Sequence, residues 1–214
     1  MVMFCLGILS GLLSSIIYGV LAWQYSIFRK VIPTNLRKSL SWEFRDQKDA
    51  EKSIIRDIKN TKTMRVFTLK CSTFCDEYAK DDTLFKVLHN SKLNIKEKYL
   101  ISSVDNPYIA ERERNLKLKK NDLKRGIEQT ISHVRDEKNL YNSSVDYRLH
   151  NEKVRFRLII FDDNLYLSYQ PEGAVSRESP MQKYPQKSSG YSALEAYFED
   201  LWSEYSKKQK KVSL

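Results

Sequence analysis

The chain begins with a run of 28 residues, Met1 to Phe28, that contains no charged side chain. The run is rich in Leu, Ile, Val and Phe, and the first charged residue is Arg29. As a helix it would extend about 40 Å, enough to cross the ~30 Å hydrocarbon core of a bilayer. A helix also satisfies its own backbone hydrogen bonds, which lipid requires. The sequence therefore predicts one transmembrane helix over residues 1–28.

The residues that follow this run predict its orientation. Trp23 and Tyr25 lie where interfacial aromatic side chains gather, and a basic juxtamembrane linker follows at residues 29–41. Because positive charge stays on the cytoplasmic side, we expect the N-terminus outside the membrane and the rest of the chain in the cytoplasm. A cleaved signal peptide is the alternative, but no basic residue precedes the run and no A-x-A site precedes Gln24.

A second pattern lies inside the same run. Gly7, Gly11, Ser15 and Gly19 recur every four residues and would line one face of the helix. Small residues at this spacing let two helix backbones approach closely in lipid, which favours self-association. The alternative is that glycine is simply commoner in membrane helices than in soluble ones.

Composition limits the partners and the chemistry. The formal net charge is +10, and basic residues cluster at 29–38, 112–125, 153–157 and 207–211. This distribution suits membrane lipid or phosphate-bearing ligands, and it equally suits a solvated surface. With three Cys and three His residues, the chain offers neither a disulfide framework nor a convincing metal site, and we expect no cofactor. Cys71 and Cys75 could be buried or could act as a redox pair.

The rest of the chain predicts one mixed-sheet α/β domain over residues 42–206, followed by a basic tail at 207–214. Helices and strands alternate early, and a hairpin around Asp162-Asp163-Asn164 comes late. A capping box at Ser192 and Glu195 predicts the start of the last helix. The expected helices are 42–60, 83–89, a single long one after Pro107, and 192–205, and the expected strands are 64–69, 99–104, 145–149, 155–161, 165–169 and 181–184.

The segment RFRLIIFDDNLYLSYQ, residues 155–170, resembles the strand–turn–strand of the phospholipase D superfamily. Members of that family carry H-x-K-x4-D, followed a few residues later by G-[ST]-x-N. The segments AEKSIIRDIKNTKTMRVF and YLISSVDNPYIAERERNL are similar to the elements that open such a domain. The resemblance covers roughly residues 42–205 as a spacing of elements, and it implies a phospholipase D-like fold.

Departures from the family motif predict that the domain is not an enzyme. If Asp162 takes the place of the motif aspartate, the lysine position falls on Arg157 and the nucleophilic histidine position on Arg155. A guanidinium stays protonated and cannot form a phosphoryl-enzyme. His150 with Lys153 is a weaker catalytic candidate, because H-x2-K places the two side chains on opposite faces of a strand.

The same segment offers a binding site without catalysis. Lys153, Arg155 and Arg157 alternate and could face one way, so that their cationic groups could bind a phosphate-bearing ligand. The alternative is that the three side chains cover a solvent-facing surface of the strand.

A transmembrane helix followed by a degenerate phospholipase D-like domain is similar in design to the small transmembrane effectors of bacterial anti-phage systems, including those paired with retrons. This resemblance implies a toxin-like protein whose cytoplasmic domain senses a phosphate ligand, a nucleic acid or nucleotide, or a partner protein. Its spans would then assemble and disrupt the inner membrane. Two alternatives stay open: a membrane-tethered phosphodiesterase or nuclease, and a scaffold that docks a partner protein at the membrane.

Overall fold

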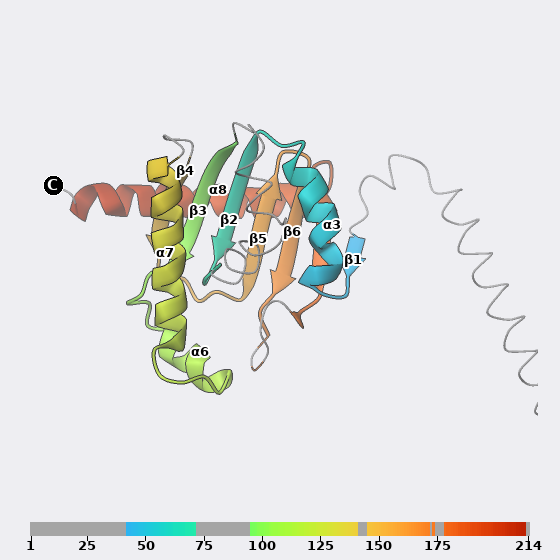
Figure 1. Ribbon diagram of the computed structural model, residues 1–214. Helices are drawn as coiled ribbons and strands as arrows, with labels where there is room; N and C mark the ends of the chain where they lie inside the picture. Colours follow the sequence, from blue (N-terminus) through green and yellow to red (C-terminus); the bar gives the residue numbers. More distant parts are fainter. Residues whose placement is uncertain (1–41, 72–94, 141–144, 172, 174–177, 213–214) are drawn as a thin grey trace, which may run out of the picture. The chain divides into compact units, whose positions relative to one another are not determined.

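The computed structural model describes residues 42–71, 95–140, 145–171, 173 and 178–212 (Figure 1). The predicted transmembrane helix, with its face of Gly7, Gly11, Ser15 and Gly19, lies outside these residues. The predicted helix at 83–89 and Cys75 lie outside them as well. No helix within the described ranges is both long enough and apolar enough to cross a membrane.

The described residues form an α/β domain with a seven-stranded mixed sheet, which confirms the predicted class. The strand order is β1-β7-β6-β5-β2-β3-β4, in which β2, β3 and β4 are parallel and each remaining pair is antiparallel. The strands are β1 (Trp42–Phe44), β2 (Thr63–Thr68), β3 (Lys96–Ser102), β4 (Val145–His150), β5 (Phe156–Phe161), β6 (Asn164–Tyr169) and β7 (Met181–Pro185).

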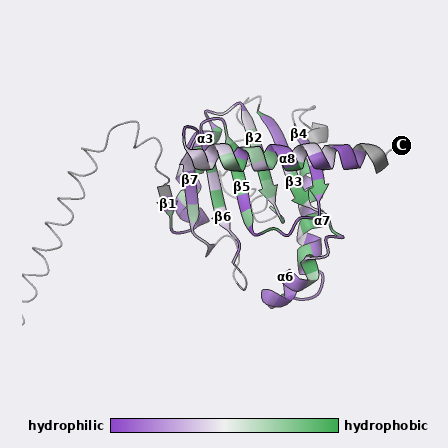
Figure 2. Ribbon diagram, turned by 180° about the vertical axis from the view of Figure 1, so that it is seen from behind, coloured by the Kyte–Doolittle hydropathy of each residue, from purple (hydrophilic) through white to green (hydrophobic). Residues whose placement is uncertain are grey.

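Helices cover both faces of the sheet. α3 (Gln47–Ile58) and α7 (Asp122–Leu140) lie on one face, and α8 (Ser189–Val212) crosses the strands on the other (Figures 1 and 2). Side chains of β5 alternate between the two layers: Ile159 and Phe161 belong to the first core cluster, and Leu158 and Ile160 to the second. The short helix α6 (Ile109–Asn115) stands at the end of the sheet where β3 ends.

The helix expected over residues 42–60 is wrong in its first part. Residues 42–44 form β1, which pairs with β7 at the edge of the sheet. Helix α3 begins only after Asp46, whose extended backbone and side chain cap it by accepting a hydrogen bond from the amide of Asp49 at 2.9 Å. The cap separates the strand from the helix.

The single long helix expected after Pro107 is also wrong. It is divided into α6 and α7 by a corner in which Lys117 and Asn121 have positive φ angles of 53° and 69°. The buried carboxylate of Glu113 holds this corner, because it accepts hydrogen bonds from the amides of Asn121 (3.1 Å) and Leu123 (2.9 Å) at the start of α7. A carboxylate also suits the positive end of a helix dipole.

The last helix begins earlier than the capping box predicts. Ser188, rather than Ser192, caps α8, because its hydroxyl accepts a hydrogen bond from the amide of Tyr191 at 3.1 Å. The helix continues to Val212, so that most of the predicted basic tail is helical. Its side chains Phe198 and Leu201 are buried against the sheet.

Candidate functional site

An open pocket with a volume of about 350 Å³ lies at the carboxyl ends of the parallel strands. Helix α6 forms one wall, and the segments that precede β5 and follow β6 form the other. Open α/β sheets bind ligands at this end of their strands, and the volume is at the lower end for small-molecule sites. The lining residues are Tyr108, Glu111, Arg112, Asn115, Lys153, Val154, Arg155, Gln170 and Pro171.

A buried asparagine fixes the two walls relative to each other. Asn106 is 4 % exposed, and its amide nitrogen donates hydrogen bonds to the Ser102 hydroxyl (2.9 Å) and the Glu152 carbonyl (3.0 Å). Its amide oxygen accepts a hydrogen bond from the backbone N–H of Tyr108 at 3.0 Å. Asn106 therefore joins the end of β3, the segment before β5 and the start of α6, so that the pocket is pre-organised.

The pocket carries more positive than negative charge. Arg112 donates from Nη1 to the Pro171 carbonyl at 2.7 Å, and Lys153 pairs with Glu111 at 2.9 Å. The hydrogen bond from Lys153 holds the pKa of Glu111 below its usual value. The exposed guanidinium of Arg155 has no ion-pair partner among the residues that the structure describes. Three cations against one carboxylate favour an anionic ligand.

Lys153, Arg155 and Arg157, the three cations predicted to bind one phosphate-bearing ligand, do not all lie in the same site. Lys153 and Arg155 line the pocket, but they precede β5 instead of lying in it. Arg157 lies within β5 and is 5 % exposed, and its Nη2 donates to Gln47 Oε1 at 2.7 Å at the start of α3. A phosphate-binding role through the pocket therefore stays a prediction for Lys153 and Arg155 alone.

His150 is placed so that both of its ring nitrogens are occupied. The ring is fully buried and stacks on Phe67, with 4.8 Å between the ring centroids. Nδ1 accepts a hydrogen bond from the Glu152 amide at 3.2 Å, so that Nε2 carries the proton and donates to the Thr68 carbonyl at 3.3 Å. Burial lowers the pKa of His150 to about 4. The imidazole is neutral and has no nitrogen directed at the pocket.

The candidate catalytic pair of His150 and Lys153 is therefore not assembled. The imidazole packs beside Tyr205 of α8, with 6.1 Å between ring centroids, whereas the ammonium of Lys153 contacts Glu111 of α6. A nucleophile and its proton-transfer partner need to be within hydrogen-bond reach of one site. These two side chains are directed to different helices.

The buried imidazole predicts that the domain loses stability in weak acid. The unfolded chain binds a proton near pH 6.5, whereas His150 in the folded chain binds one only near pH 4. Stability is therefore lost as the pH falls through this window, by about 2–3 kcal/mol. Urea unfolding at pH 7 and pH 4.5 should show a smaller loss for His150→Gln than for the unchanged chain. An identical loss in the two proteins would contradict the assignment.

Asp162, at the position of the motif aspartate, has a structural role at the far end of β5. Its carboxylate accepts hydrogen bonds from the Lys62 amide (2.6 Å) and from the Thr63 hydroxyl. Burial alone would raise the pKa of Asp162, but these hydrogen bonds hold it below its usual value. Because β5 separates Asp162 from Arg155 by about 20 Å of extended chain, this carboxylate is not part of the pocket.

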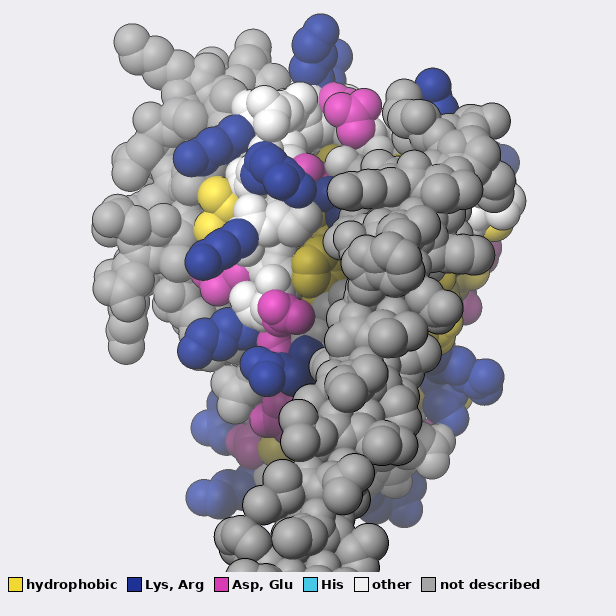
Figure 3. Space-filling model, turned by 90° about the vertical axis from the view of Figure 1, so that its right-hand side faces the viewer, with side chains coloured by type: hydrophobic (Ala, Val, Ile, Leu, Met, Phe, Trp, Pro, Cys, Tyr) yellow, Lys and Arg dark blue, Asp and Glu magenta, His cyan; other side chains and the backbone are white. Residues whose placement is uncertain are grey.

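A second polar cluster lies beneath α3, on the first face of the sheet. Lys183 Nζ donates to Asp57 Oδ2 at 2.7 Å, and both side chains are only 10 % exposed. The Tyr166 hydroxyl donates to the same carboxylate at 2.6 Å and lies 2.8 Å from the Ser53 hydroxyl. Each polar group in the cluster has a partner, which indicates a structural network. The surface at the edge of the domain that carries α3 and β1 mixes Lys and Arg with Asp and Glu (Figure 3).

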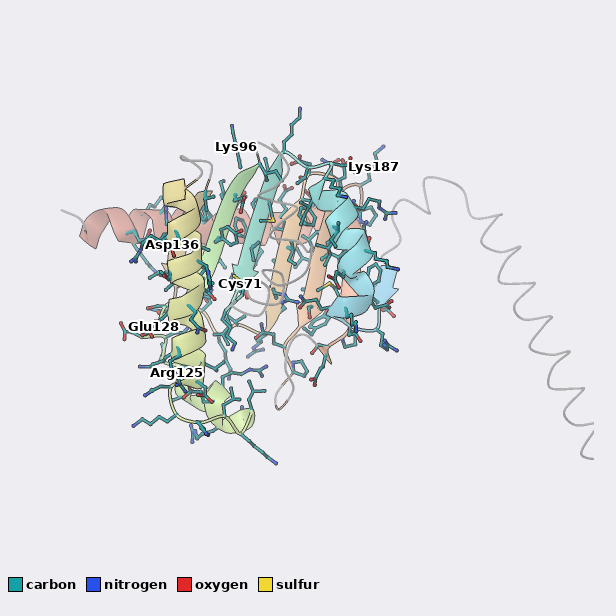
Figure 4. The ribbon with its side chains drawn as sticks, viewed as in Figure 1. Cys71, Lys96, Arg125, Glu128, Asp136 and Lys187 are labelled. Atoms are coloured by element: carbon teal, nitrogen blue, oxygen red, sulfur yellow. The ribbon has the colours of Figure 1, made fainter. Side chains whose placement is uncertain are left out.

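The structure describes one of the two cysteines considered for redox chemistry. Cys71 is buried, and its amide donates to the Thr130 hydroxyl of α7 at 3.1 Å (Figure 4). Cys75 lies outside the described residues, so that a redox pair stays a prediction. Within the described ranges, no three His, Cys, Asp or Glu side chains are grouped so that they could hold a metal ion.

No protein-family model and no curated protein matches this chain. Among solved structures, it is similar to TrmBL2, an archaeal chromatin protein described as showing a novel mode of DNA binding. The TM-score is 0.45 at 10% sequence identity, and the match covers 89% of this chain and 62% of TrmBL2. A likeness of this size carries no argument about function.

Proposed function

We propose that the described domain is a non-catalytic receptor for a phosphate-bearing ligand, tethered to the membrane by the N-terminal span. The observation that carries the proposal is the guanidinium of Arg155, an exposed cation of the pocket with no ion-pair partner among the described residues. If Asp162 is aligned with the motif aspartate of the phospholipase D superfamily, Arg155 falls at the position of that family's nucleophile. A guanidinium binds phosphate through a planar set of donors, but it cannot attack it.

The fold supports a degenerate phospholipase D-like domain at the level of element order. Three parallel strands lie beside the antiparallel hairpin of β5 and β6, and this hairpin carries the segment that resembles the family. His150, the candidate nucleophile of the hydrolytic alternative, is buried with both ring nitrogens bonded and is not directed into the pocket. The receptor proposal needs only the cations that are present.

In this proposal the receptor controls a membrane-damaging effector. Ligand binding to the cytoplasmic domain releases or orders the N-terminal spans, which associate through Gly7, Gly11, Ser15 and Gly19 and disturb the inner membrane. A bacterial anti-phage defence system, of the retron type or a similar one, is the setting that this design suits. The partners are membrane lipid, further copies of the chain, and the ligand or partner protein that supplies the signal.

Removing the pocket charge tests the link between receptor and effector. Lys153→Glu with Arg155→Glu should abolish the depolarisation that the full chain causes when its expression is induced in bacteria, measured with a potential-sensitive dye. Lys96→Glu with Lys187→Glu is the matched control, because both are exposed lysines at the end of the sheet opposite α6 (Figure 4). Equal depolarisation by the pocket variant and the unchanged chain, at equal expression, would contradict the proposal.

Removing the carboxylate of the pocket should strengthen phosphate binding, whereas removing the cations should weaken it. Glu111 pairs with Lys153 at 2.9 Å and competes with any incoming phosphate for that ammonium. Glu111→Gln should therefore raise the affinity of the full chain for inorganic phosphate by about three- to tenfold at low salt, measured by calorimetry. Glu128→Gln, on the exposed side of α7, is the control and should leave the affinity unchanged. A weaker affinity in Glu111→Gln would mean that phosphate does not bind at Lys153.

A further inference from the structure

An aromatic ring stands beside the cations of the pocket. Tyr108, at the start of α6, is 42 % exposed although most large apolar side chains of the described domain are buried. Its backbone is held by the buried Asn106, and the ammonium of Lys153 lies 5.6 Å from its ring centroid. One ligand could therefore place a planar group against the ring and a phosphate against the ammonium. An exposed face of this kind can stack on an aromatic base.

Two amide side chains add hydrogen-bonding groups to the same pocket. Asn115 lies at the end of α6, and Gln170 follows β6, where its backbone N–H donates to the Arg155 carbonyl at 2.7 Å. An amide offers both donors and acceptors, which is what the edge of a nucleobase requires. A pocket for phosphate alone needs neither an exposed ring nor neutral amides.

We propose that the ligand of this pocket is a nucleoside phosphate, with its base on Tyr108 and its phosphate between Lys153 and Arg155. This inference rests on the proposed receptor function and adds the chemical class of the ligand. The pocket volume of about 350 Å³ suits one nucleotide unit. Arg112, which bonds the Pro171 carbonyl at 2.7 Å, links α6 to the segment after β6 and acts as a positioning residue.

The test compares ligands that differ only in the base. The full chain in maltoside detergent is titrated by calorimetry with AMP, GMP, CMP and UMP, and with ribose 5-phosphate. At least one nucleotide should bind about tenfold more tightly than ribose 5-phosphate, because stacking of one base contributes roughly that factor or more. Tyr108→Leu should remove this difference and leave the affinity for ribose 5-phosphate within about twofold, whereas Tyr108→Phe should keep the difference.

Tyr169→Leu is the matched control, because Tyr169 is 50 % exposed and does not line the pocket. It should leave every affinity unchanged. Equal affinity for the nucleotides and ribose 5-phosphate would overturn the nucleotide inference and leave the receptor function standing. A preference for nucleotides that survives in Tyr108→Leu would overturn the placement of the base. Absence of binding by all five probes would overturn both proposals.

Discussion

Replacing Asp57 by alanine should lower the free energy of unfolding by about 3–5 kcal/mol. Asp57 accepts hydrogen bonds from Lys183 Nζ (2.7 Å) and from the Tyr166 hydroxyl (2.6 Å) beneath α3. The ammonium of Lys183 is 10 % exposed, and without the carboxylate it would be a buried charge that lacks its counterion. The variant also removes the acceptor of a buried phenol, whose pKa is raised chiefly by burial and which therefore stays a donor.

Urea unfolding of the full chain in detergent measures the effect. Glu204→Ala is the control, because its ion pair with Lys208 lies on the surface of α8 and should contribute less than about 1 kcal/mol. The double variant Asp57→Leu with Lys183→Met should recover much of the loss, since replacing a buried ion pair by apolar groups is often close to neutral. A loss below about 1 kcal/mol for Asp57→Ala would show that the ammonium of Lys183 is not a buried charge that depends on Asp57 as its counterion.

The second large effect concerns the membrane. If the chain is the proposed membrane effector, Gly11→Ile with Gly19→Ile should abolish its depolarisation of the membrane, because two branched side chains keep the backbones of neighbouring helices apart. Leu9→Ile with Leu13→Ile is the control, because these residues lie on another face of the predicted helix and the changes preserve its hydropathy. Both variants should stay in the membrane fraction on carbonate extraction. Unchanged depolarisation by the glycine variant would contradict assembly through this face.

Six of the seven strands were predictable because their signal is local, whereas β1 lies where a helix was expected. The hairpin of β5 and β6 reads directly from alternating apolar residues on either side of Asp162-Asp163-Asn164. The α6–α7 corner was not predictable in the same way, since it depends on the buried carboxylate of Glu113 and on a left-handed backbone at Lys117. Lysine gives no signal for that conformation, and helix propensity alone favours an unbroken helix.

The candidate site was predictable only in part. Lys153 and Arg155 stand out as closely spaced cations, and the structure places both in the pocket. Arg157 has the same signal, but its guanidinium bonds Gln47, a residue 110 positions away, and no local pattern predicts such a contact. Tyr108 and Gln170 reach the pocket from separate elements, so that their contribution depends on the tertiary fold.

Phosphorus-31 NMR with cyclic AMP tests most directly whether the domain binds a phosphate ligand without cutting it. Cyclic AMP carries a nucleobase and a phosphodiester, so that binding and hydrolysis are both visible in one spectrum. With the full chain in maltoside detergent, we expect saturable broadening of the diester resonance that Lys153→Glu with Arg155→Glu removes. We expect no monoester resonance after overnight incubation, because neither Arg155 nor His150 can act as the nucleophile. A growing monoester resonance would contradict a non-catalytic receptor.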